Sequence, residues 1–457
     1  MYQINNFYNK ISKLELPLII PELIEPNKNI FTILVGKNGM GKSTLLGEIA
    51  KSSKLPQNHG SKVIAISTSP FEKFPQENLK QRISSDKIRE KSPSNYKYIG
   101  MSGNLNSNTS ISLISSAMKG LFEQIIHNNN LNKIIEVFKM LEFMPILEFS
   151  FQPLFKTRVY SKHEKKVIKD TPLSYELQNI EDRYNIEFDA KAYIYFSDLY
   201  DDEVSRVLYS LTLLLEDYYG YNKKKMITFG INFQRNEIFT PHDSIDRYFS
   251  LQTLDALNIL LEHNLVRLMD VRYEKIGLEQ MSLRKASSGE QCLTALMLGI
   301  SGHITDGSLV LIDEPEISLH PMWQKEFMTL LIKTFSHYEN CHFIIATHSP
   351  QIIANLKKEN CFVSSLTDNA VYPAEYFCEK SSDFQLAELF GAPGFKNEYL
   401  SRLLINIFAK FSEYKKFDDE DIKYLKLIEN IIDRIDESDP VYELYMTLNR
   451  FKEEKHA

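Results

Sequence analysis

Residues 30–44 read IFTILVGKNGMGKST, an apolar run that leads directly into a glycine-rich loop. The apolar part, Ile30–Val35, predicts a buried strand, and the residues from Gly41 onward predict a helix. The loop itself, Gly36–Thr44, matches the pattern GxxxxGK[ST], in which glycines without Cβ atoms let backbone N–H groups approach phosphates. The N-terminus of the following helix adds positive potential. This order of strand, loop and helix predicts an α/β nucleotide-binding domain.

Each position of this loop has an expected role in binding ATP and Mg²⁺. Lys42 is expected to reach the β- and γ-phosphates, and the Ser43 hydroxyl is expected to coordinate Mg²⁺. Thr44 is placed to support the α-phosphate. The loop backbone completes the predicted ATP-binding set, which also includes Gly36, Asn38, Gly39 and Gly41.

A second apolar run, LVLID at residues 309–313, predicts a buried strand that ends in a carboxylate. Asp313 would emerge at the carboxyl edge of the sheet and hold Mg²⁺, directly or through water. Glu314 follows it and is suited to orient or deprotonate the attacking water. Taken alone, an apolar run ending in Asp-Glu is also common in purely structural strands.

Two further motifs have both a structural and a functional interpretation. SSGEQ at residues 287–291 opens a predicted helix, either as an ordinary N-cap or as a phosphate-facing helix terminus. IIATHSP at residues 344–350 ends an apolar strand at His348. The ring N–H of His348 can hydrogen-bond a γ-phosphate, although a histidine after a strand is often structural.

The order of the four motifs is more specific than any one of them. Gly289, Asp313 and His348 lie 24 and 35 residues apart, and all follow the phosphate loop. This arrangement resembles the ABC ATPase superfamily, whose signature usually reads LSGGQ. The resemblance implies a head-to-tail dimer with two ATP molecules in the interface. Lys42, Glu314 and His348 would then be catalytic, while Ser288, Gly289 and Glu290 would contact the ATP held by the other protomer.

The chain departs from the ABC pattern at two places. ABC domains usually carry a glutamine after the strand predicted at 96–101, and here only Asn104 is available as a weak substitute. The aromatic residue that would stack on adenine is not identified by any motif. Tyr8 and Phe31 are the candidates.

The spacing of the motifs also predicts the domain organisation. Between Thr44 and Ser287 lie 242 residues, which is more than a transporter nucleotide-binding domain contains. The predicted fold is α/β: an ABC-type P-loop ATPase head with an inserted, mostly helical subdomain and a C-terminal helical tail. The expected divisions are the head's N-terminal part, the insertion, the head's C-terminal part and a tail for assembly or partner binding, at residues 1–104, 105–265, 266–383 and 384–457.

The composition indicates which cell compartment and which kinds of partner to expect. The net charge is −7, although residues 1–100 alone carry +7, either as a basic surface for phosphates or as scattered lysines. The cysteines form no CxxC pair, which favours reduced thiols in the cytoplasm. The N-terminus is polar, and the sequence has no apolar run of about 18 residues, so we expect no membrane partner.

The run DEPEISLHPMWQ at residues 313–324 resembles the subgroup related to RecF, Rad50 and the overcoming-lysogenization-defect nucleases. In this class Ser318 and His320 would sense the partner protomer, unless they simply start a helix ahead of Pro321. The long heptad arms of Rad50, a Toprim domain and an HNH-type histidine cluster are not recognisable. We therefore expect no nuclease chemistry in this chain.

Over most of its length the chain resembles the ATPase subunit of bacterial Septu anti-phage systems (PtuA), also found with certain retrons. The similarity includes STSPFEKFP at 67–75, ATHSP at 346–350 and LAELFGAPGFKNEYLSR at 386–402. It implies an HNH nuclease partner (PtuB-like), ATP-gated cleavage of nucleic acid through that complex, and assembly beyond the dimer. Two alternatives stay open: a RecF-like DNA repair or recombination ATPase that binds DNA directly, and a nucleotide-bound scaffold with negligible turnover.

Overall fold

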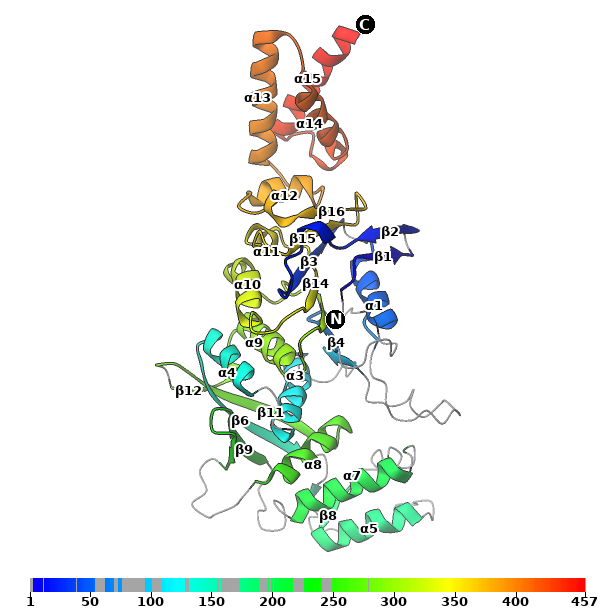
Figure 1. Ribbon diagram of the computed structural model, residues 1–457, viewed down its shortest axis with the longest axis vertical. Coiled ribbons are helices and arrows are strands. Elements are labelled where there is room, and N and C mark those ends of the chain that lie inside the picture. Colours follow the sequence, from blue (N-terminus) through cyan, green and yellow to red (C-terminus); the bar gives the residue numbers. More distant parts are fainter. Residues whose placement is uncertain are drawn as a thin grey trace.

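The computed structural model describes residues 3–10, 12–37, 39–53, 62–69, 73–75, 95–100, 109–127, 131–153, 156–157, 172–188, 196, 199, 201–216, 226–240, 249–277 and 279–456. The molecule is elongated, with a parallel sheet in its middle (Figure 1). A second, antiparallel sheet and several helices lie toward one end. The C-terminal helices form the other end.

The central sheet has seven strands in the order β16-β15-β3-β14-β13-β4-β5. All neighbours are parallel except β15 and β16, which pair antiparallel. The strands are β3 (Ile30–Val35), β4 (Val63–Ser67), β5 (Tyr96–Ile99), β13 (Leu309–Asp313), β14 (His342–Ala346), β15 (Cys361–Ser365) and β16 (Ala370–Pro373). Because β3, β14 and β13 are adjacent and parallel, their carboxyl ends meet at one edge of the sheet. The predicted α/β class of a P-loop ATPase is confirmed.

The two faces of this sheet are covered by different helices. On one face, Leu34 of β3 packs in a core with Leu45 and Leu46 of α1 (Lys42–Ser53). The alternate residue Ile33 belongs to a larger core shared with α9 (Ser288–Ser301) and α10 (Pro321–Thr334). Figure 1 accordingly shows α1 on one side of β3 and β14, with α9 and α10 on the other. Successive side chains of a strand point to opposite faces of the sheet. The helix of the phosphate loop and the helix that begins with the SSGEQ motif therefore pack on opposite faces.

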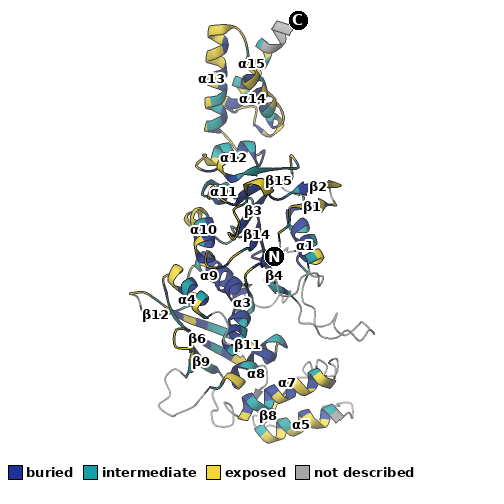
Figure 2. Cartoon of the chain, in the orientation of Figure 1, coloured by how far each residue is buried: buried dark blue, intermediate teal, exposed yellow. Residues whose placement is uncertain are grey.

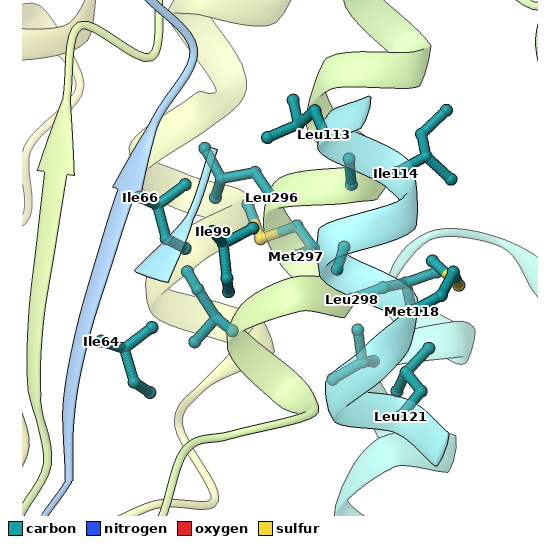
Figure 3. Close-up of a cluster of buried hydrophobic side chains, with 14 of the residues drawn as sticks. Ile64, Ile66, Ile99, Leu113, Ile114, Met118, Leu121, Leu296, Met297 and Leu298 are labelled. Atoms are coloured by element: carbon teal, nitrogen blue, oxygen red, sulfur yellow. The ribbon is translucent and has the colours of Figure 1, made fainter. Parts of the chain in front are cut away.

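Helix α9 is held against the sheet by a second helix, α3 (Thr109–Ile126). Figure 3 shows Ile66 of β4 and Ile99 of β5 facing the α9 side chains, with α3 packed behind α9. The approach is close on both sides of α9, since a Cβ at Gly299 would lie 3.1 Å from Ile99 Cδ1 of the sheet and 3.2 Å from Ala117 Cβ of α3. The insertion therefore packs directly on the ATPase head through α3.

The second sheet is antiparallel and has the order β10-β9-β6-β11-β12. Its strands are β6 (Phe143–Pro153), β9 (Ile227–Asn232), β10 (Glu237–Phe239), β11 (Val266–Lys275) and β12 (Gln280–Ser282). Strand β6 pairs with β11 from Val266↔Pro153 onward, so the predicted division between residues 265 and 266 runs through one hydrogen-bonded sheet. Phe149 on the buried face contacts Phe122 of α3 at a ring distance of 5.0 Å.

Most of the remaining insertion is helical where the structure describes it, as the apolar spacing indicates. Its other elements are α4 (Leu131–Met140), β7 (Lys156–Thr157), α5 (Pro172–Tyr184), β8 (Ile186–Glu187), α7 (Asp201–Leu214) and α8 (Leu251–Glu262). Near the N-terminus, β1 (Asn6–Asn9) and β2 (Leu14–Pro17) form a separate hairpin. Within the described residues, no helix is both long enough and apolar enough to cross a bilayer.

The C-terminal tail is helical, as the sequence predicts. After α11 (Pro350–Ala354) and α12 (Ser382–Glu388), its helices are α13 (Glu398–Tyr414), α14 (Asp419–Glu429) and α15 (Pro440–His456). Their apolar faces form a core of their own, around Leu404 and Leu448. Figure 2 shows exposed residues along the outer side of α13. Asp418 and Asp421 form a capping box at the start of α14, so these two carboxylates cap the helix.

Candidate functional site

The phosphate loop connects β3 to α1. Gly39 and Gly41 have φ angles of +81° and +84°, a left-handed conformation that glycine adopts without steric cost. Lys42, Ser43 and Thr44 form the first turn of α1, where backbone N–H groups have no partner within the helix. Asn38 lies outside the described residues. The geometry is that of an anion cradle at a helix N-terminus.

Lys42 is buried at the centre of the site. Its Nζ donates to the Gly36 carbonyl oxygen at 2.9 Å and lies 3.4 Å from His348 Nδ1. Burial lowers the pKa of Lys42 to about 8, against the opposing influence of Glu314, Glu316 and Asp313. The ammonium is thus fixed above the loop, where a triphosphate would supply the negative charge that it lacks.

Ser43 and Asp313 form the candidate Mg²⁺ site. Ser43 Oγ donates to Asp313 Oδ1 at 3.1 Å, which joins the first turn of α1 to the end of β13. Burial raises the pKa of Asp313 to about 7, although the hydrogen bond from Ser43 opposes the shift. A hydroxyl and a carboxylate are hard oxygen ligands of the kind that Mg²⁺ takes beside substrate phosphates. These residues therefore fit the ion, which would neutralise charge on the phosphates.

Glu314 and His348 face each other beside this pair. Glu314 has φ +48°, and its carbonyl oxygen accepts the Thr68 hydroxyl at 2.7 Å. Its Oε1 lies 3.7 Å from His348 Nε2. Burial, and to a lesser degree Lys42, lower the pKa of His348 to about 4, so the ring is neutral at pH 7. We assign the proton to Nε2, because Nδ1 faces the Lys42 ammonium.

The SSGEQ motif begins α9, as the sequence predicts. Ser287 is the N-cap and accepts the Glu290 N–H at 3.3 Å, while Ser288 is exposed. The Glu290 carboxylate is bound within the chain, to Lys275 at 2.6 Å and to the Tyr273 hydroxyl at 2.8 Å. Of the residues predicted to contact a partner's nucleotide, Ser288 is thus free to do so, whereas Glu290 anchors α9 to β11.

The predicted residues therefore form two groups. Lys42, Ser43, Asp313, Glu314 and His348 converge at the carboxyl edge of the central sheet. Ser288 and Gly289 start a helix on the face of the sheet opposite α1. The motifs alone do not predict that the two groups lie on different faces of the sheet. This separation follows from the alternation of side chains along β3.

Four further residues complete the comparison of the site with the sequence. Phe31 is buried and its ring stacks on Phe343 at 4.8 Å, so the suggestion that it stacks on adenine is wrong. Tyr8 is 53% exposed on β1, and Asn104 lies outside the described residues. The sequence reasoning missed Glu316, whose Oε1 accepts the backbone N–H of His348. Its only signal was a third carboxylate in the run DEPE.

These pKa values predict a pH dependence for Mg-ATP binding. Below pH 7 Asp313 is protonated in the free protein, and Mg²⁺ must displace that proton. Affinity should therefore fall by up to about tenfold per pH unit below 7. Above pH 8 Lys42 loses its proton in the free protein, so phosphate binding must take a proton up and affinity should fall again. Calorimetric titrations in buffers of different ionisation enthalpy measure both protons.

Asp313→Asn provides the control for this experiment, since ATP itself also titrates near neutral pH. The variant should bind Mg-ATP more weakly and lose the proton release assigned to Asp313. If Asp313→Asn released the same number of protons on binding, the loss of affinity below pH 7 would belong to another group.

Comparison with known proteins agrees with this geometry. Residues 31–354 match the family described as "AAA domain, putative AbiEii toxin, Type IV TA system". "Retron Vc95 probable ATPase" of Vibrio cholerae serotype O1 biovar El Tor is 25% identical over 77% of this chain and 70% of its own length. "Retron Ec83 probable ATPase" of Escherichia coli is 26% identical, over 33% of this chain and only 30% of its own length. The chain belongs to this AAA-domain family and is a P-loop ATPase similar to those of retrons.

Proposed function

We propose that this chain hydrolyses ATP with Mg²⁺ as a head-to-tail dimer that holds two nucleotides in its interface. One observation carries the proposal: the phosphate loop and the tip of α9, which the resemblance to ABC ATPases assigns to one nucleotide site, flank opposite faces of one sheet. A second copy in two-fold symmetric arrangement brings Ser288 and Gly289 of each protomer to the other's phosphate loop. Two equivalent sites result.

In this dimer each residue of the site has one task. Lys42 holds the β- and γ-phosphates, and Ser43 and Asp313 hold Mg²⁺. Glu314 orients or deprotonates the attacking water, while the neutral His348 donates its Nε2 proton toward the γ-phosphate. Hydrolysis is slow until the dimer closes, because Ser288 and Gly289 act only on the partner's nucleotide.

We further propose that ATP turnover gates a partner nuclease of the HNH type in anti-phage defence, as in Septu systems. The similarity to retron ATPases supports a defence role. The tail offers a surface for assembly or for this partner: Ile405 and Phe408 of α13 and Met446 of α15 are exposed apolar residues. Nucleic acid would be engaged through the complex with the nuclease.

Co-expression with the neighbouring reading frame tests this role. If that frame encodes a small HNH protein, we expect it to co-purify with the chain and to cut DNA or RNA at a rate that changes with ATP concentration. Lys42→Ala should retain the complex and abolish the ATP effect, because the lysine's phosphate contacts are lost. Failure to form a complex, together with no ATP effect on cleavage, would refute the gating role.

A further inference from the structure

The segment after β13, residues 314–324, touches two parts of the site that lie far apart in the sequence. One is the loop that carries His348, and the other is the tip of α9. The segment turns tightly, with the Leu319 N–H donating to the Glu316 carbonyl oxygen at 2.9 Å. One short, hydrogen-bonded segment therefore joins the two parts of the site.

Glu316 holds the His348 loop through a hydrogen bond to its backbone. Its Oε1 accepts the backbone N–H of His348, and its side chain is largely buried. Burial raises the pKa of Glu316, while the hydrogen bond to His348 opposes that rise. A buried carboxylate is costly unless it is hydrogen-bonded, so this contact fixes both partners. The ring nitrogens of His348 lie close to Lys42 Nζ and Glu314 Oε1.

Gln324 makes a second connection from the same segment. Its Oε1 accepts the Ser349 hydroxyl at 2.8 Å. Its amide Nε2 donates to the carbonyl oxygens of Leu319 at 3.0 Å and Glu316 at 3.4 Å. One side chain thereby joins the turn after β13 to the residue that follows His348.

The other end of the segment lies against α9. A Cβ built on Gly289 would meet the Ser318 carbonyl oxygen at 3.1 Å and the His320 nitrogen at 3.5 Å. Ser318 stands between Glu316 and Gln324 in this turn. Even a methyl group added at Gly289 would crowd this backbone, so the tip of α9 and the turn at Ser318 are packed closely against each other.

We propose that Glu316 and Gln324 are positioning residues that connect the tip of α9 to His348. Contact of Ser288 with the partner's γ-phosphate moves the turn at Ser318, and Glu316 and Gln324 move the His348 loop with it. Each protomer thus adjusts its own hydrolytic site to the nucleotide held by its partner. The inference rests on the proposed dimer and adds a path by which its two sites are coupled.

Glu316→Ala tests this path in the full-length protein. We expect kcat for ATP hydrolysis to fall about tenfold or more, because the buried His348 N–H loses its acceptor. The Kd for Mg-ATP should stay within about threefold, since Lys42 and the phosphate loop bind nucleotide without His348. We expect a Hill coefficient for ATP above one in the wild type and a value closer to one in Glu316→Ala. Glu316→Gln should restore most of kcat and cooperativity, because its amide oxygen can accept the same N–H.

Gln324→Ala should lower the Hill coefficient with a smaller loss of kcat, since Glu316 still holds the loop. Glu181→Ala is a matched control, because Glu181 is also a buried carboxylate that accepts a backbone N–H, that of Phe188 at 2.7 Å. It should lower the melting temperature without changing the Hill coefficient. The same pattern in Glu316→Ala, or wild-type kcat and cooperativity in that variant, would overturn the inference. Absence of turnover or of cooperativity in the wild type would instead overturn the proposed dimer.

Discussion

Replacing Glu314 with glutamine is expected to lower kcat for ATP hydrolysis by about 100-fold or more, the usual contribution of a general base. The amide keeps the size of the side chain but cannot take a proton from water. Lys42, Ser43 and Asp313 are unchanged, so Mg-ATP should still bind. Bound ATP that is not hydrolysed should accumulate the closed dimer. Phosphate release measures the first effect, and light scattering after size exclusion with ATP measures the second.

Glu339→Gln serves as the control for charge removal, because Glu339 is exposed and precedes β14 at its amino end, away from the site. It should leave both turnover and dimerisation unchanged. Equal turnover in wild type and Glu314→Gln would remove Glu314 from the catalytic role. If neither protein turned ATP over, the scaffold alternative would be favoured.

The central sheet could be predicted because its strands are local signals. IFTILV, LVLID and CHFIIA are short apolar runs bounded by glycine, charge or turn residues, and each became a strand that is buried throughout. A parallel sheet covered by helices on both faces requires this continuous apolar pattern.

The antiparallel sheet could not be placed from the sequence in the same way. From Leu147 to Pro153 its strand β6 alternates buried and more accessible residues, which indicates a strand but not its partner. The partner β11 begins more than a hundred residues later, beyond α5, α7 and α8. Because pairing of strands across such a separation has no local signature, the expected division at residues 265/266 fell inside the sheet.

The site was predictable where a motif determines the backbone as well as the side chain. GKNGMGKST specifies a loop and a helix start, and LVLID places Asp313 at a strand end. Glu316 was missed because its contact is with a backbone N–H in another loop, and backbone groups leave no trace in residue types. Glu290 was given a role in trans because its anchors, Tyr273 and Lys275, lie on β11, a strand whose position the sequence did not fix.

Mixing two inactive variants is expected to restore activity if the sites are shared between protomers. Lys42→Ala removes the phosphate contact of its own loop, and Ser288→Arg blocks the tip of α9 with a bulky side chain at an exposed position. Each homodimer should lose nearly all hydrolysis. In a mixed dimer, one site combines both defects and the other combines two intact halves. An equal mixture should therefore recover at most about a quarter of wild-type turnover when protomers exchange freely, and less if the intact site also depends on nucleotide bound at the defective one.

The controls for this mixture separate shared sites from independent ones. Ser288→Arg alone should bind Mg-ATP with near wild-type affinity, because the phosphate loop of the same chain is intact and lies on the opposite face of the sheet. Mixing Lys42→Ala with Asp313→Asn should restore nothing, since both changes damage the same half of the site. Recovery in that second mixture, or none in the first despite confirmed exchange of protomers, would mean that each chain hydrolyses ATP alone.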